Sequence, residues 1–162
     1  MDWRDIVPWL LLLHVLAAIV AIGPNFAYST IRGLARQEPQ HANFATRVSH
    51  AISARLVYPV GLVIPATGIA MILILGIDLT ARAAWWLDAA IVIYSGVYLY
   101  SFFVQRRIVE QIIEMTATPP PPGATGPPPA LAALANRAAQ GGSAMLILLV
   151  VVVALMVVKP QF

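Results

Sequence analysis

The sequence predicts an all-α protein, a bundle of four helices that each cross a lipid bilayer. Three observations lead to this fold class. Hydrophobic residues make up 60% of the 162 residues. Charged residues make up only 10%, whereas a soluble domain carries about 25%. In addition, the chain holds four apolar segments near the length of about 20 residues that a helix needs to span the hydrocarbon of a bilayer.

Charged or helix-breaking residues bound each predicted span. The spans cover residues 6–31, 56–77, 83–105 and 138–158. Arg32, Asp78 and Arg106 end the first three, and Lys159 with the following proline ends the fourth. The spans and their connections use nearly all of the chain, so we expect a single transmembrane domain over residues 1–162.

Basic residues gather on two of the three connections and predict the orientation. The first and third connections carry seven: Arg32, Arg36, Arg47, Arg55, Arg106, Arg107 and Arg137. The opposite side carries three: Arg4, Arg82 and Lys159. Because cytoplasmic loops are enriched in arginine and lysine, we expect a bacterial inner-membrane protein with both termini outside the cytoplasm. A secretory signal peptide is the competing interpretation of the N-terminus, but Asp2 and Asp5 outnumber Arg4 and the apolar run is too long.

The two cytoplasmic connections differ in kind. Within residues 40–54, Phe44, Val48 and Ile52 recur at helical spacing, which predicts a short amphipathic helix at the level of the lipid headgroups. Residues 116–130 contain seven prolines and two glycines, which predict a polyproline-like linker between the third and fourth spans. Recognition of this linker by a proline-binding domain is the less favoured interpretation.

His14 is the strongest candidate for a functional residue. It lies about eight residues inside the first span, roughly 12 Å from its outer end. Ionisable side chains are costly inside a membrane and are functional candidates by default. Asp88 enters the third span from the same side at a comparable depth, and Tyr94 continues a polar face deeper along that span. One interpretation therefore makes His14, Asp88 and Tyr94 a proton-handling group, with a hydrogen bond between His14 and Asp88.

A second interpretation makes His14 an axial ligand of haem b, because a neutral imidazole on a membrane helix commonly holds haem iron. Met71 and Met156 lie at suitable depth on the second and fourth spans as candidates for the second ligand, and five-coordinate iron is the other option. A third interpretation is structural, with His14 hydrogen-bonded across helices. No other metal site is predicted, and the lack of cysteine excludes iron–sulfur clusters.

Two stretches of sequence resemble known families. The segment WLLLLHVLAAIVAIG, the four-span layout and the closing LMVVKP resemble bacterial membrane proteins known as domain of unknown function 2269. More distantly, the first-span histidine and RLVYPVGLVIPATG are similar to the four-helix protoporphyrinogen oxidases and to copper-resistance D proteins. The oxidase resemblance implies haem binding at His14. The further membrane histidines and the lysine of the oxidases have no counterpart here, since Lys159 is the only lysine.

Two classes of function remain open. No nucleotide-binding, hydrolase or metalloprotease motif occurs, and nothing indicates nucleic-acid binding. The first class is a haem-associated or proton-linked redox or biogenesis protein centred on His14. The second is a non-catalytic subunit or assembly factor that binds a membrane-protein partner, or another copy of itself, within the bilayer. It would hold the partner through its glycine-rich face and its cytoplasmic arginines. We also expect the small-residue face of the second span to lie in the bundle interior: Gly61, Pro65, Gly68, Ile72 and Gly76.

Overall fold

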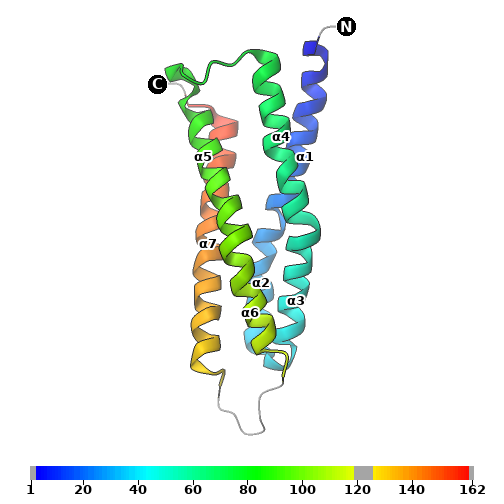
Figure 1. Cartoon of the computed structure of the whole chain (residues 1–162), viewed down its shortest axis with the longest axis vertical. Helices are drawn as coiled ribbons and strands as arrows, with labels where there is room; N and C mark the ends of the chain where they lie inside the picture. Colours follow the sequence, from blue (N-terminus) through cyan, green and yellow to red (C-terminus); the bar gives the residue numbers. More distant parts are fainter. Residues whose placement is uncertain (1–2, 119–125, 161–162) are drawn as a thin grey trace.

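A computed structural model describes residues 3–118 and 126–160 of the chain. Four long helices run side by side, and the start of the first and the end of the last lie at the same end of the bundle (Figure 1). The four cover Trp3–Gln37, Pro39–Leu75, Arg82–Met115 and Pro129–Val158, and each is long and apolar enough to cross a membrane. Within the described ranges there is no strand. The predicted all-α fold with four membrane helices is therefore confirmed.

Short turns divide three of the long helices into regular segments. The regular helices are α1 (Val7–Ile22), α2 (Pro24–Gln37), α3 (Ala42–Ile52), α4 (Tyr58–Leu75), α5 (Trp85–Tyr100), α6 (Arg106–Met115) and α7 (Pro129–Val158). A π-helical turn joins α3 to α4, and a second one joins α5 to α6. Pro24 separates α1 from α2, because its ring carries no backbone N–H for the helical ladder.

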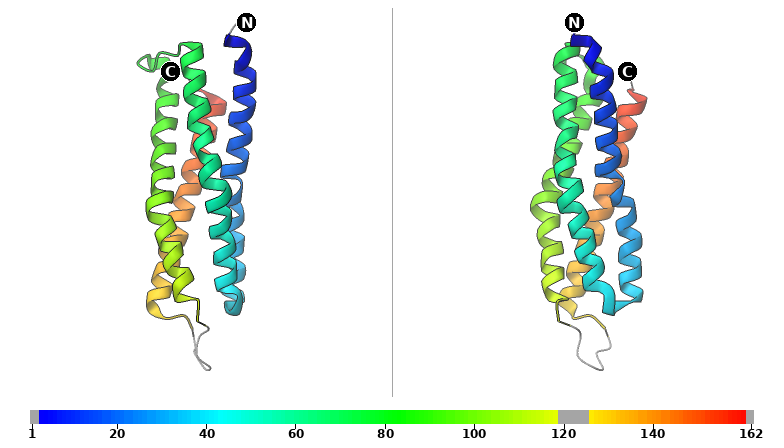
Figure 2. Two further views of the ribbon diagram at one scale, coloured as in Figure 1. Left: turned by 45° about the vertical axis from the view of Figure 1, so that its right-hand side comes forward. Right: turned by 90° about the vertical axis from the view of Figure 1, so that its right-hand side faces the viewer.

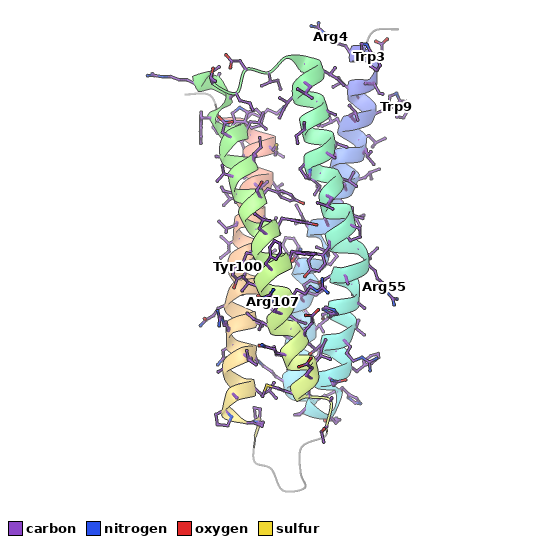
Figure 3. All side chains as sticks on the ribbon, in the orientation of Figure 1. Trp3, Arg4, Trp9, Arg55, Tyr100 and Arg107 are labelled. Carbon is purple, nitrogen blue, oxygen red and sulfur yellow. The ribbon has the colours of Figure 1, made fainter. Side chains whose placement is uncertain are left out.

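The helices extend well past the predicted spans at one end. The helix Trp3–Gln37 has 35 residues, which is about 52 Å at 1.5 Å per residue, whereas the hydrocarbon layer is about 30 Å thick. The helix length that exceeds the hydrocarbon layer lies in the half of the bundle that carries most arginines, which we call the arginine-rich half. The opposite end, with Trp3 and Val158, is the terminal end. Figure 3 shows Arg4 and Trp9 near the terminal end and Arg55 and Arg107 in the arginine-rich half.

The segment predicted as a separate amphipathic helix at residues 40–54 is arranged differently. Here α3 runs through the π-helical turn directly into α4, and it packs against α2 and α6. The reason is local, since no proline or glycine interrupts the chain between Ala42 and Tyr58 and nothing stops the helix. In the same half, Ile108 and Ile112 of α6 are buried against Ala138 of α7.

The third and fourth long helices also differ from the predicted bounds. The third continues to the end of α6 at Met115, and α7 begins at Pro129 instead of residue 138. Of the proline-rich linker predicted for residues 116–130, residues 119–125 lie outside the described residues, and its last two residues belong to α7.

Two helix pairs form the terminal half of the bundle. α1 packs along α4, and α5 packs along α7 (Figures 1 and 2). The first pair encloses a core of Ala17, Ala21 and Ile64. The second pair encloses a core of Val97, Met145 and Leu149. Apolar packing thus holds each pair together, and it also links the pairs, because Tyr94 of α5 packs against the first core and Ile22 of α1 against the second. A polar connection between the pairs is also present.

A hydrogen bond between α4 and α5 provides that connection. Pro65 has no N–H, so the carbonyl of Gly61, four residues earlier, lacks its helical donor. The hydroxyl of Tyr94 on α5 donates to this carbonyl at 2.7 Å. Tyr98 likewise donates to the carbonyl of Tyr58 at 3.0 Å, and the Tyr58 hydroxyl donates to the carbonyl of Ser101 at 3.3 Å. We call Tyr58, Tyr94 and Tyr98 the tyrosine junction.

Glycine at position 61 makes the tyrosine junction possible. A Cβ atom there would lie 3.0 Å from the Tyr98 ring and 3.3 Å from the Tyr94 hydroxyl. Gly68 faces His14 at ordinary van der Waals distance. Gly76 is different, because it is exposed and ends α4 with a left-handed φ of 62°. The prediction that Gly76 belongs to the interior face of small residues is therefore wrong, because this glycine ends the helix.

Gly61→Ala is expected to destabilise the bundle by about 1–3 kcal/mol, because the added methyl group must displace the tyrosine rings of α5. The measurement is thermal unfolding of the purified protein in detergent. Gly96→Ala on α5 is the matched control, since nothing lies within 4 Å of a Cβ at that position. An unfolding midpoint for Gly61→Ala equal to that of the wild type would contradict this expectation. It would show that the tyrosine rings can shift to accept the methyl group without loss of stability.

Candidate functional site around His14

His14 lies on α1 and faces α4. Its Nδ1 atom is 2.9 Å from Oγ1 of Thr67, a side chain that is only 5% exposed. The neighbouring Gly68 lies beside the imidazole, and a Cβ there would make an ordinary van der Waals contact with His14 Cε1 at 3.6 Å. The imidazole itself is partly buried. The first span therefore carries a histidine that is anchored to the second span.

The hydrogen bonds of Thr67 bear on which imidazole nitrogen carries the proton. Thr67 Oγ1 lies 2.7 Å from the carbonyl oxygen of Val63 and 3.0 Å from that of Ile64, two acceptors for its single hydrogen. When that hydrogen goes to a carbonyl, His14 donates from Nδ1–H to Thr67 and the lone pair stays on Nε2. In that tautomer the neutral imidazole presents Nε2 as its proton acceptor or ligand atom.

Asp88 and Tyr94 are not joined to His14. α1 packs on α4 rather than on α5, which carries both residues. In the described part of the chain, no hydrogen bond or ion pair connects His14 with Asp88, so Thr67 takes the place that the sequence assigned to Asp88. The Tyr94 hydroxyl is committed to the carbonyl of Gly61. The predicted hydrogen bond between His14 and Asp88 is therefore wrong, because Thr67 intervenes on the helix that packs against α1.

The two methionines proposed as second haem ligands are also apart from His14. Met71 is on α4 four residues beyond Thr67, one helical turn nearer the terminal end. α1 and α4 are in direct contact at His14 and Gly68, which leaves no room for a porphyrin ring between His14 and Met71. Met156 belongs to α7, which pairs with α5. The pairing of His14 with Met71 or Met156 as axial ligands stays a prediction.

The other two histidines lie in the arginine-rich half. His41 Nδ1 is 2.8 Å from Glu38, and His50 Nε2 is 3.9 Å from Glu110. Among residues 3–118 and 126–160, no group of three or more histidine, cysteine or carboxylate side chains is arranged to hold a metal ion. His14 is thus separate from both of the other histidines.

A small, mainly apolar cavity lined by a few polar groups lies deeper in the bundle, and the sequence did not indicate it. Its volume is about 30 Å³, which is enough for one or two water molecules. The residues that line it are Ala21, Ile22, Asn25, Val57, Tyr58, Tyr94, Val97, Tyr98, Ser101, Met145 and Leu149. Asn25 donates to the carbonyls of Ala21 and Ile22 in the turn around Pro24. The buried side chains of Ala17 and Ile64 separate this cavity from His14 along the α1–α4 pair.

Comparison with known proteins gives one match. A family model described as "Predicted integral membrane protein (DUF2269)" covers residues 8–160 of the chain. The family resemblance inferred from the sequence is therefore confirmed. No curated protein and no solved structure matches the chain.

Thr67→Val is expected to change the tautomer of His14, because valine keeps the shape of threonine but removes the acceptor for Nδ1–H. NMR spectra of protein with isotope-labelled histidine in lipid nanodiscs should show Nδ1 protonated and Nε2 unprotonated in the wild type. The variant should lose this preference. Thr46→Val is the control, since Thr46 also donates to a helical carbonyl but lies on α3. The same tautomer in Thr67→Val and wild type would contradict the assignment.

Proposed function

We propose that this chain, which belongs to the DUF2269 family of predicted integral membrane proteins, handles protons within the membrane through His14. One observation carries the proposal: the hydrogen bond between His14 Nδ1 and Thr67 Oγ1. When Thr67 donates its own hydrogen to the backbone, it can accept from Nδ1–H whether the imidazole is neutral or protonated. A proton therefore binds and leaves at Nε2 while the contact between α1 and α4 stays intact.

The surroundings of His14 support exchange with the terminal end. Ala17 and Ile64 are buried on the deeper side of the imidazole, so a proton that crosses the bundle must pass them to reach the cavity beyond. Asp88 lies on α5 in the same half of the bundle and is partly buried. We assign Asp88 as a carboxylate that relays protons near the terminal end, and Tyr94 as the polar group of the deeper cavity. An imidazole in this position has the chemistry of a proton-accepting site in a membrane protein.

A haem b bound through His14 is the second candidate. The observation that favours it is the same tautomer, because a metal-ligating histidine usually donates its other ring N–H to a fixed acceptor. His14 Nε2 is the atom of this chain that would hold the iron, and haem would supply one-electron chemistry. Met71 or Met156 would be the second ligand from this chain, and five-coordinate iron with His14 as its single axial ligand is the other option.

The expected location supports a proton-handling role. We place the protein in the bacterial inner membrane with the arginine-rich half toward the cytoplasm. This rests on the seven arginines of the first and third connections against three basic residues on the other side. His14 then lies in the outer half of the membrane, the side from which protons enter along the gradient of a respiring cell.

His14→Gln is expected to abolish proton uptake by liposomes that contain the purified protein and an internal pH dye. Acidification after a drop in external pH should fall to the rate of empty liposomes, because glutamine has no group that binds a proton near neutral pH. His50→Gln is the matched control, since His50 lies on α3 in the arginine-rich half.

Equal uptake rates for wild type and His14→Gln would contradict the proton role and favour the alternative, a non-catalytic subunit or assembly factor. Absorption spectra of the same preparations test the haem candidate. A Soret band that is lost in His14→Gln supports it. A colourless wild-type protein from haem-replete cells would exclude it.

Single-cysteine labelling tests the orientation, and the chain suits it because it contains no cysteine. Ala81→Cys lies in the exposed connection between α4 and α5. It is expected to react with a membrane-impermeant maleimide in spheroplasts, cells that have lost the outer membrane but keep an intact inner membrane. Gln37→Cys, at the exposed end of α2, should react only after lysis. The reverse pattern would place the arginine-rich half outside the cytoplasm.

A further inference from the structure

Arg32 occupies the contact between α2 and α7. A Cβ atom at Gly142 would lie 3.2 Å from Nη1 and 3.6 Å from Nη2 of Arg32, so the guanidinium rests against the α7 backbone. The side chain is partly buried, in contrast to the exposed arginines at positions 36, 47, 55, 107 and 137. Glycine at position 142 therefore gives this charged group a place between two helices.

The positive charge at this contact has no counterion within the described part of the chain. Arg32 forms no hydrogen bond or ion pair there. Glu38 is bound by His41, and Glu110 is bound by Arg106 at 2.8 Å. Arg36 follows one turn later on α2 and adds a second positive charge near the first. Arg36 is exposed, so the partly buried Arg32 is the charge for which an anion from elsewhere would be most favourable.

The depth of Gly142 indicates which anion is available. Gly142 directly precedes Ser143 and the uninterrupted apolar run 144–158 of α7. The Arg32 guanidinium therefore lies where the hydrocarbon layer ends and the lipid phosphates begin. A guanidinium presents a planar set of donors that matches phosphate oxygens in pairs. Basic pockets between membrane helices at this level are known to hold lipid headgroups.

The surface above Gly142 distinguishes a lipid from a soluble phosphate. Val153 and Val157 follow Gly142 on α7 at helical spacing, toward the terminal end. They are 43% and 75% exposed. Between Gly142 and these valines, Met145 and Leu149 are buried, and the exposed edge of α7 runs through Val150. An acyl chain can lie along this edge above a phosphate bound at Arg32. Inorganic phosphate would make no use of this edge.

We propose that Arg32, assisted by Arg36, binds the phosphate of an anionic phospholipid at the contact between α2 and α7. The site is distinct from His14, and it does not depend on the proton role. Gly142 admits the guanidinium, and the exposed valines of α7 receive the acyl chain. The bound lipid supplies the counterion that the chain lacks, so it stabilises the folded bundle.

Phosphatidylglycerol is the probe for this site. Adding it to the full-length protein in neutral detergent is expected to raise the thermal unfolding midpoint more than phosphatidylcholine does. Arg32→Gln should lose this difference. Its affinity for phosphatidylglycerol should fall about fivefold, which corresponds to about 1 kcal/mol for one basic residue near an anionic lipid. Arg55→Gln is the matched control, because Arg55 is an exposed arginine of the same half.

Two further measurements keep the outcome decisive. Native mass spectrometry should show fewer phosphatidylglycerol molecules retained by folded Arg32→Gln than by wild type, even where the variant is less stable. Gly142→Val should have the same effect with the charge unchanged, because the new side chain displaces the guanidinium. Equal retention in wild type and Arg32→Gln would overturn the proposal. An equal stabilisation by inorganic phosphate alone would also overturn it, and would assign the site to a soluble anion.

Discussion

The hydrogen bond from Tyr94 to the Gly61 carbonyl is the constraint on which the rest of the structure depends. Pro65 leaves that carbonyl without a helical donor, and in a membrane no water replaces it. The hydroxyl of Tyr94 satisfies the carbonyl at 2.7 Å and so joins the α1–α4 pair to the α5–α7 pair. Apolar packing cannot select this arrangement by itself, because lipid tails are as apolar as the helix surfaces.

The site at His14 also depends on pairing each hydrogen-bond donor in the membrane with an acceptor. The Thr67 hydroxyl bonds both to the α4 backbone and to the imidazole. This arrangement holds α1 against α4. Among the described residues, Nε2 of His14 has no hydrogen-bond partner. Its lone pair could bind a proton or a haem iron, and these are the two functions to test. A purely structural histidine would leave that atom without a role.

The long helices give the protein a membrane part and a part beyond it. At about 52 Å, the helix Trp3–Gln37 exceeds the hydrocarbon by roughly 20 Å, and the excess carries most of the arginines. Ile108, Ile112 and Ala138 form a buried cluster in this half. Arg32 lies at the boundary between the two parts, where a guanidinium can meet lipid phosphate while its helix continues toward water.

Several features followed from the sequence because they depend on composition and local spacing. Apolar length fixed four membrane helices, and His14 stood out as the one histidine within the apolar segments. Helix pairing was decided only by the tertiary structure, since apolar helices of similar length give no signal for which two pack together. That choice placed Thr67 beside His14 in place of Asp88, and it gave the Tyr94 hydroxyl to Gly61. It also placed Arg32 against Gly142, because a close approach of two helices depends on three-dimensional packing and not on residue spacing along one of them.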